Sequence, residues 1–376
     1  MTIRILQGDC RQVMLTLDES SVDAVVCDPP YELGFMGKSW DASGVAFDPA
    51  TWRAALRALK PGGHLLAFSG TRTYHRMVCA VEDGGFEIRD QIGWAFGSGF
   101  PKSHNGEWGG TALKPAWEPI VLARKPLIGT VAANWREHGT GALNIDACRV
   151  GYAGTEDAAA AAAEIRSRQT QRNTDGWGMR DQDLTAEAYL AGAAGLGRWP
   201  ANLLHDGSDE VIASFPAAPG QLAKASTSDT QRARQNTYGV MTRGSNGVEP
   251  RGDAGSAARF FYCAKADKHD RNEGLEGRAT DDGRQVPADN AYQRGKSVRK
   301  NHHPTVKPTD LMRYLCRLIT PAGGLVLDPF MGSGSTLKAA ELEGLSAIGI
   351  ELDPQYIEIA RRRIAADMPL FAEVES

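Results

Sequence analysis

The sequence predicts an α/β fold in which a parallel sheet is covered by helices on both faces. Two observations lead to this prediction. Over residues 1–125, short runs of strand length take turns with segments of helical period. The same alternation returns over residues 301–366, after a long middle region of different composition. Strands that alternate with helices connect as parallel units, and the connecting helices then cover the sheet.

The N-terminal segment begins with three predicted elements. Thr2–Leu6 alternates polar and apolar residues, as a half-buried strand does, and Cys10–Leu17 is predicted to be a helix. Ala24–Cys27 is a short apolar strand. It continues directly into the tetrapeptide Asp28-Pro29-Pro30-Tyr31.

A second helix is expected after Asp48-Pro49, because an acidic N-cap followed by proline in the first turn is a common helix start. Pro61-Gly62-Gly63 should end this helix, and His64–Phe68 is the next strand. Two more strands follow. Apolar residues at even spacing from Phe86 to Phe96 mark the first, and Pro119–Ala123 is the second.

The C-terminal segment repeats this style. A helical apolar stripe over Leu311–Ile319 precedes the strand Leu325–Leu327. A glycine loop, the helix Thr336–Glu343 and the strand Ser346–Ile350 come next. Asp353-Pro354 then begins a last helix in the same way as the second helix of the chain.

The middle region, residues 126–300, is rich in Gly, Arg, Asn, Asp and Gln and predicts one clear strand, Arg259–Cys263. Residues 224–307 hold 16 Lys and Arg against 10 Asp and Glu, a net charge of +6, whereas the whole chain has a net charge of −4. The rest of the chain is therefore acidic. A basic insert in an acidic body is either a solvated loop or an element that grips phosphates.

Composition excludes several classes of protein. The six cysteines are far apart and form no CxxC pair, so neither a structural zinc site nor a disulfide framework is expected, and no metal is implied. No apolar run is long enough to span a bilayer, and the N-terminus lacks the pattern of a signal peptide. The expectation is a protein of the reducing cytoplasm with no membrane partner.

The tetrapeptide Asp28-Pro29-Pro30-Tyr31 can carry chemistry. Its plainest interpretation is a turn, but two prolines also make a rigid loop with few donors. The Asp28 carboxylate beside the Pro29 carbonyl offers two acceptors for a planar amine, and the Tyr31 ring can stack on a base. Two acceptors localise the lone pair of an aromatic amine and stabilise the positive charge that grows as it attacks a methylsulfonium carbon. Asp28 is the expected acceptor of the proton that leaves.

This tetrapeptide after an apolar strand resembles the catalytic motif of the amino-methyltransferases that act on DNA. The form with aspartate first is typical of family members that methylate N6 of adenine. Cytosine-N4 enzymes usually begin the motif with serine, and RNA and protein-glutamine enzymes with asparagine. Adenine N6 is therefore the predicted target, cytosine N4 is the nearest alternative, and an RNA methyltransferase is more distant. A DNA-binding module without catalysis is a fourth interpretation, which the intact motifs disfavour.

A glycine loop between a predicted strand and helix is the second motif, and it allows a ligand close to the backbone. Neither a P-loop nor the full dinucleotide fingerprint is present, because no Gly-Lys-Ser/Thr follows and Leu337 stands at the third glycine position. Glu351 ends the next strand, where an acid can bind ribose hydroxyls. The loop and this acid resemble the S-adenosylmethionine motif of the same family, which implies as cofactor ligands Asp328, Pro329, Phe330, Gly332, Ser333, Gly334, Thr336 and Glu351.

Two shorter segments extend the resemblance. His303–Pro308 is similar to the family segment that lines the methionine end of the cofactor, and it supplies Thr305 and Lys307. Gly8-Asp9-Cys10 resembles the element that meets the cofactor's adenine, and Asp28 is counted with the cofactor ligands as well as with catalysis.

The order of the motifs resembles the β-group of this family, in which the halves of a Rossmann-like, class I methyltransferase sheet are circularly permuted. The resemblance implies a catalytic half over 1–125, an inserted target-recognition region over 126–300, a cofactor half over 301–366 and a tail over 367–376. Within the insert, Gly139–Arg149 and Gly197–Gly207 resemble segments of phage and prophage members.

Duplex DNA is the implied partner, and its target base must leave the helix to reach the site. Tyr31 would stack on that base, and Trp94 or Phe96 would either form the opposite wall or pack within their strand. A homodimer and a cognate restriction endonuclease are the further partners that the resemblance allows. Phosphate contacts, with the steep salt dependence that they cause, are predicted for Arg271, Arg294, Lys296, Arg299 and Lys300.

Overall fold

The structure is a computed structural model that describes residues 1–34, 39–99, 106–151, 197–217, 256–264 and 306–367, with short pieces at 235–236, 239–240, 273, 275, 301 and 374–375. It forms two compact units. The first combines Met1–Cys148, Ala201–Ser208 and Cys263–Ser376, and the second combines Arg149–Pro200 and Asp209–Tyr262.

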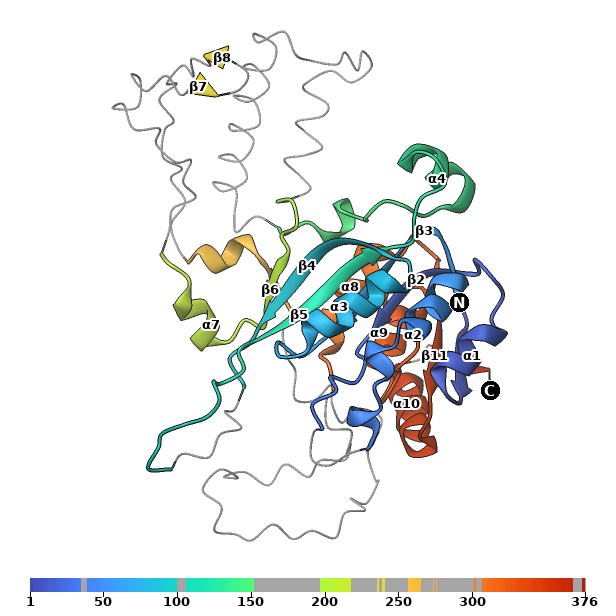
Figure 1. The fold of residues 1–376 in the computed structure, drawn as a ribbon, viewed down its shortest axis with the longest axis horizontal. Coiled ribbons are helices and arrows are strands. Elements are labelled where there is room, and N and C mark those ends of the chain that lie inside the picture. Colours follow the sequence, from blue (N-terminus) through green and yellow to red (C-terminus); the bar gives the residue numbers. More distant parts are fainter. Residues whose placement is uncertain are drawn as a thin grey trace. The chain divides into compact units, whose positions relative to one another are not determined.

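A long sheet organises the first unit, with the strand order β12-β1-β11-β10-β2-β3-β5-β4-β6 (Figure 1). The N-terminal part of the chain supplies β1 (Ile3–Gln7), β2 (Val22–Cys27), β3 (Leu59–Phe68), β4 (Glu87–Ala95) and β5 (Trp117–Arg124), and the middle region supplies β6 (Leu203–His205). The C-terminal part supplies β10 (Leu325–Asp328), β11 (Ser346–Glu351) and β12 (Val374–Glu375). A further short strand, β9 (Tyr262–Cys263), spans the boundary between the two units.

Helices form a layer on each face of this sheet. On one face α1 (Cys10–Thr16), α2 (Pro49–Ala58) and α3 (Tyr74–Asp83) pack side by side, and on the other α8 (Thr309–Ile319), α9 (Ser335–Leu342) and α10 (Pro354–Asp367) do so (Figure 1). A smaller helix, α4 (Val131–His138), packs near β3. The expectation of an α/β fold with both faces covered is confirmed.

The buried core explains this arrangement. Met14, Trp52 and Met77 lie at most 1% exposed on the inner sides of α1, α2 and α3, where they meet the apolar strand residues. Asp48 caps α2 as the sequence predicts, since its carboxylate accepts from the Ala50 N–H at 2.9 Å. Tight apolar packing on both sides of the central strands fixes their register and therefore the positions of the loops at their ends.

The expected parallel sheet is only partly right. β1, β11, β10, β2 and β3 run parallel to one another, but β5 runs antiparallel to both β3 and β4. The connection from β4 to β5 contains no helix among its described residues, and antiparallel neighbours do not need a helical crossover.

Two local predictions also need correction. Helix α2 ends at Ala58, before Pro61–Gly63, and β3 takes up these residues with a register shift against β2 between Val22 and Ala24. The predicted strand Arg259–Cys263 is shorter, because Ala257–Phe260 forms a 3-10 turn that Ser256 caps. The hydroxyl of a serine N-cap satisfies a free backbone N–H, and this local bond favours the turn over a strand.

The second unit is described in pieces. It contains α7 (Asp209–Ser214), a two-stranded antiparallel ribbon of β7 (Gln235–Asn236) and β8 (Gly239–Val240), and an isolated bridge between Val150 and Arg198. Arginines stack on aromatic rings here, with the Arg149 guanidinium 5.1 Å from the Trp199 ring centre. The predicted division at residues 125 and 300 stays a prediction.

Candidate active site

Neighbouring strands bring the two motifs together at one edge of the sheet. β2 and β10 are paired and parallel, with Ala24 opposite Val326, so the residues that follow both strands emerge side by side. A cavity of about 1550 Å³ opens at this edge. Its lining includes both predicted motifs, namely Gly8–Cys10, Asp28–Tyr31, Lys307, Asp328–Ser333, Thr336 and Glu351.

Hydrogen bonds from residues outside the tetrapeptide Asp28–Tyr31 hold it in place. The hydroxyl of Thr73 donates to the carbonyl oxygen of Tyr31 at 2.8 Å, and the Asp41 carboxylate accepts from the backbone N–H of Glu32 at 3.0 Å. Glu32 adopts a φ of +56°, a conformation that non-glycine residues rarely take. Its carboxylate in turn accepts from the Gly44 N–H at 2.8 Å. These bonds fix the backbone directly after Tyr31.

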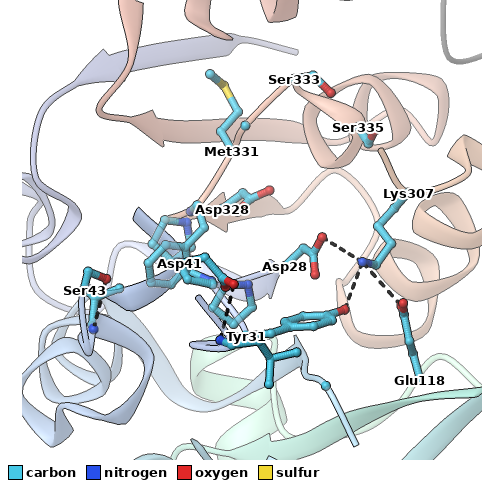
Figure 2. A pocket seen from close by; sticks show the side chains of 18 of the residues that line it. Asp28, Tyr31, Asp41, Ser43, Glu118, Lys307, Asp328, Met331, Ser333 and Ser335 are labelled. Carbon is cyan, nitrogen blue, oxygen red and sulfur yellow. Dashed lines mark hydrogen bonds and ion pairs between the residues drawn. The ribbon is translucent and has the colours of Figure 1, made fainter. Parts of the chain in front are cut away.

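We call the part of the cavity around Asp28, Tyr31 and Glu118 the catalytic corner, after the role that the sequence predicts for Asp28. Lys307 lies at its centre (Figure 2). Its Nζ donates to Asp28 Oδ2 at 2.7 Å and to Tyr31 Oη at 3.0 Å, and it forms an ion pair with Glu118 Oε2 at 3.4 Å. The ammonium also lies 4.7 Å from the centre of the Phe68 ring. Two oxygens therefore accept hydrogen bonds from the ammonium, and a third balances its charge from slightly farther away.

Burial and charge set the protonation of this corner. Burial raises the pKa of Asp28, the Lys307 ammonium lowers it and Glu118 raises it again, and the net direction is upward. Burial lowers the pKa of Lys307, but the carboxylates of Asp28 and Glu118 raise it by more. The net pKa lies above its ordinary value, so the ammonium keeps its proton. Burial also raises the pKa of Tyr31 well above its usual range, which keeps the phenol neutral.

One acceptor in this corner has no donor. Asp28 Oδ1 is buried, and among the residues that the structure describes none gives it a hydrogen bond. A buried carboxylate oxygen without a donor is costly, and native proteins generally satisfy such atoms. The atom belongs to a residue that lines the cavity, so a donor on a bound ligand would supply the missing bond.

The glycine loop is held mainly by its own backbone. Asp328 Oδ1 accepts from the Phe330 N–H at 2.9 Å, and Glu351 Oε2 accepts from the Gly332 N–H at 2.9 Å. Gly332 and Gly334 have φ values of +52° and +81°, which favour glycine. A Cβ on Gly334 would lie 2.9 Å from the Cβ of Ala360 on α10, so the loop passes close to that helix.

Two carboxylates beside the glycine loop, in the part of the cavity that we call the glycine corner (Asp328–Thr336 and Glu351), have raised pKa values. Burial raises the pKa of Asp328 to about 7, although hydrogen bonds from Thr336 and Phe330 lower it. Burial likewise raises the pKa of Glu351. Asp9 differs, because the Arg11 side chain that it binds at 2.7 Å lowers its pKa.

A buried arginine supports the loop from behind. Arg363 on α10 is 0% exposed, and its Nη1 donates to the Ser333 carbonyl at 2.7 Å and to the hydroxyls of Ser333 and Ser335 at 3.1 Å each. The guanidinium therefore fixes the turn that opens α9.

The structure brings most predicted site residues to one cavity. Gly334 is the described exception, since it lies against α10 and does not line the cavity. Phe96 lines the cavity, whereas Trp94 is buried in β4 and does not. The remaining predicted residues lie outside the described residues, namely Thr305, Arg271, Arg294, Lys296, Arg299 and Lys300.

Sequence reasoning missed two charged residues near the motifs. Glu118 is the carboxylate of β5 and lies one residue before the predicted strand. The available signal in the sequence was a single acid beside an apolar run. Arg363 follows two other arginines in a helix, so nothing in the sequence separates it from exposed neighbours. Among the described residues, no group of three or more His, Cys, Asp or Glu could hold a metal ion. No described helix is long and apolar enough to cross a membrane.

Comparison with known proteins shows the family of the chain. The model of the family described as DNA methylase, N6_N4_Mtase, matches residues 22–362. The chain belongs to the N6/N4 DNA methylase family. The match begins at β2, just before Asp28, and ends in α10, so it includes both corners of the cavity.

Individual members of the family match over shorter stretches. The chain is 32% identical over 83 residues to the type II methyltransferase M.ScaI of Streptomyces caespitosus, which is 22% of this chain and 27% of that protein. It is 40% identical over 74 residues to the type II methyltransferase M2.DpnII of Streptococcus pneumoniae, which is 19% of this chain and 28% of that protein. The chain thus spans less than a third of the length of these relatives.

Solved structures of DNA methylases align over most of the chain. The cytosine-N4-specific PvuII DNA methyltransferase aligns with a TM-score of 0.48 at 14% identity, over 99% of this chain and 89% of its own. TTHA0409 of Thermus thermophilus, solved in complex with S-adenosyl-L-methionine, aligns with a TM-score of 0.42 at 19% identity, over 100% of both chains.

Proposed function

We propose that this chain transfers a methyl group from S-adenosylmethionine to the exocyclic N6 amine of adenine in duplex DNA, after the base has been flipped out of the helix. The observation that carries the proposal is the buried Asp28 Oδ1, which has no hydrogen-bond donor among the described residues. An amine N–H of a base in the cavity would supply that donor. The family to which the chain belongs supports the same chemistry.

The residues of the catalytic corner would act on the amine in sequence. Asp28 Oδ1 accepts one N–H of the base, which localises the nitrogen lone pair toward the methyl donor. The Tyr31 ring stacks on the base, with Phe96 as the opposite wall of the cavity. The amine nitrogen would take the methyl group as its bond to the sulfonium sulfur breaks, which would leave a neutral thioether, and the amine would lose one proton to Asp28. The Lys307 ammonium meanwhile keeps the carboxylate in position through Oδ2.

The residues of the glycine corner fit S-adenosylmethionine, which supplies a methyl group on a positively charged sulfur when it is bound. Asp328 and Glu351 are buried carboxylates with raised pKa values in the cavity wall, and a cationic ligand would favour their ionised forms. Gly332 lines the cavity and has no side chain to keep a ligand away from the backbone there. Asp9 and Cys10 would lie at the adenine end, and Thr305 is assigned to the methionine end by resemblance alone.

The contacts of Lys307 support a role beside Asp28, whereas its sequence motif implies cofactor binding. Its Nζ donates hydrogen bonds to Asp28 and Tyr31 and forms an ion pair with Glu118. We therefore assign Lys307 to the catalytic corner, and cofactor binding by this residue remains the prediction of its motif.

The circular permutation predicted from the motif order is part of this proposal. In its support, the late strands β10 and β11 lie between the early strands β1 and β2. The choice of adenine rests on aspartate as the first residue of the tetrapeptide, since the same acceptors would serve cytosine N4. Phosphate contacts by the basic residues of the insert complete the proposal.

The test is a methylation assay with product analysis. The purified chain is incubated with unmethylated duplex DNA and S-adenosylmethionine, and the DNA is digested to nucleosides for mass spectrometry. We expect N6-methyladenine, and a loss of at least about 100-fold with Asp28→Ala. N4-methylcytosine would keep the mechanism and overturn the base, and cofactor binding without any methylated DNA base would overturn DNA as the substrate.

A further inference from the structure

We propose that Glu118 is a positioning residue of the catalytic corner, which holds the Lys307 ammonium between two carboxylates and so sets how readily Asp28 takes a proton. This inference rests on the proposed function. It concerns a residue that the sequence motifs do not include, on a strand that contributes nothing else to either motif.

The geometry gives Glu118 this position. Its Oε2 lies 3.4 Å from Lys307 Nζ, on the opposite side of the ammonium from the glycine loop, while Asp28 Oδ2 lies 2.7 Å from the same nitrogen (Figure 2). The side chains of Lys307, Asp28 and Glu118 are 7%, 17% and 22% exposed. Charges this close and this poorly solvated interact strongly.

The charges of the cluster explain why a second carboxylate is useful. With Asp28 alone, the ammonium would neutralise the carboxylate and weaken it as an acceptor for an amine. With Glu118 added, two carboxylates share one ammonium, and the cluster has a net charge of −1 when all three groups are ionised. That net charge favours the positive charge that develops on the amine, and it also favours proton uptake by Asp28.

The buried oxygen of Glu118 supports a functional role. Glu118 Oε2 has no hydrogen-bond partner among the described residues and depends on the ion pair with Lys307. A carboxylate that served only to stabilise the fold would be expected to gain hydrogen bonds in exchange for the water that it loses. Glu118 also lines the cavity, so a bound base would reduce the remaining solvent around it.

Other titratable groups lie near Asp28 as well. Asp328 at the end of β10 and the thiol of Cys27 on β2 interact with it electrostatically, and the Tyr31 hydroxyl shares its lysine. These groups affect the absolute pH at which Asp28 titrates. They are the same in every variant below, so the difference between variants reports on Glu118 and Lys307.

The experiment is the pH dependence of kcat for DNA methylation by the full chain and three variants. Glu118→Gln removes a negative charge near Asp28, so the acid limb of the profile should move to lower pH. The plateau should fall on the order of tenfold, less than the 10²–10⁴-fold that a general base supplies, with KM for DNA nearly unchanged. Lys307→Met removes the cation, so its acid limb should move to higher pH. Glu118→Asp keeps the charge and should keep the wild-type limb, even if Glu118→Gln folds poorly.

Glu87→Gln is the matched control. Glu87 on β4 pairs with Arg124 of β5 at 2.6 Å, on the strand that holds Glu118, but it does not line the cavity. This variant should leave the profile unchanged. An active wild type whose limb does not move in Glu118→Gln, or moves in the same direction as in Lys307→Met, would overturn the inference alone. A wild type that methylates no DNA would overturn the proposed function and the inference with it.

Discussion

Two corners of one cavity begin with the same dipeptide and are built in different ways. Asp28-Pro29 follows β2 and Asp328-Pro329 ends β10, and the two strands are paired neighbours. Asp28 is paired with Lys307, which lies 279 residues away in the sequence. Asp328 is instead bonded to the backbone of Phe330 and to the hydroxyl of Thr336, both within eight residues.

From this difference we expect the first corner to act in the chemistry and the second to shape the binding site. In the catalytic corner, a buried oxygen of Asp28 is left without a donor among the described residues, and ionised side chains surround it. In the glycine corner, the Gly332 N–H donates to Glu351, and the buried Arg363 donates to the Ser333 carbonyl. We therefore expect substitutions in the first corner to lower turnover with little effect on stability, and substitutions in the second that remove a buried donor or add a clash to lower stability.

The largest stability effect is expected for Arg363→Met. This change leaves the Ser333 carbonyl and two serine hydroxyls without their buried donor, so the free energy of unfolding should fall by about 2–4 kcal/mol. Chemical denaturation without cofactor measures this loss.

Arg362→Met is the control for this prediction. Arg362 is the neighbouring residue, 48% exposed, and pairs with Glu358 on the same helix, so its loss should cost at most about 0.5 kcal/mol. Equal losses in the two variants would show that the guanidinium behind the glycine loop does not support it, and the comparison of the two corners would fail.

The two corners also differ in how far sequence predicts them. The glycine corner is local, because strand, loop, helix and acid all fall within residues 325–351, and the sequence predicted each of them. In the catalytic corner, the sequence predicted the tetrapeptide but neither the Lys307–Asp28 pair nor Glu118. The positions of β5 and of residue 307 relative to β2 depend on tertiary packing, which no local pattern encodes.

The same reasoning applies to the fold. Periodicity and caps predicted α1, α2 and α8 and the central strands, because those patterns are short-range. The direction of β5 was not predictable, since residues 96–116 carry no pattern that distinguishes a crossover from a reversal. Helix α3, Tyr74–Asp83, also received no prediction, and its apolar residues Met77, Ala80 and Val81 form only a narrow stripe.

A smaller effect is expected for Gly334→Ala, with Gly344→Ala as its control. Both glycines have left-handed φ values, +81° and +72°, so alanine is strained at each by about 1 kcal/mol. A Cβ at Gly344 meets nothing within 4 Å, whereas at Gly334 it would lie 2.9 Å from Ala360. Gly334→Ala should therefore lower the free energy of unfolding by about 2–3 kcal/mol, and the difference from Gly344→Ala measures the contact with α10. If both variants lose the same amount, the loop does not depend on close packing against that helix.

The smallest effect is expected for Asp328→Asn, and its sign depends on pH. Burial raises the pKa of Asp328 to about 7 in the folded chain, above the ordinary value of 3.8. The folded state therefore holds this proton more tightly than the unfolded state, so the contribution to stability is complete at low pH and is lost as pH rises toward about 7. Asparagine is neutral at every pH and avoids this loss. Without cofactor, we compare the Tm of the variant minus that of the wild type at two pH values. This difference should be about 2–4 °C larger at about pH 8 than at about pH 5.

The same variant should bind S-adenosylmethionine more weakly at about pH 8, because it lacks the charge that a cationic ligand would favour. Calorimetry of both proteins at the two pH values tests this, and Asp28→Asn is the comparison. Burial also raises the pKa of Asp28, but the Lys307 ammonium opposes that rise, so substitution of Asp28 should give a smaller gain in Tm at high pH. A Tm difference for Asp328→Asn that is independent of pH would mean that the loop keeps Asp328 ionised. Both Asp-Pro corners would then stabilise an ionised carboxylate.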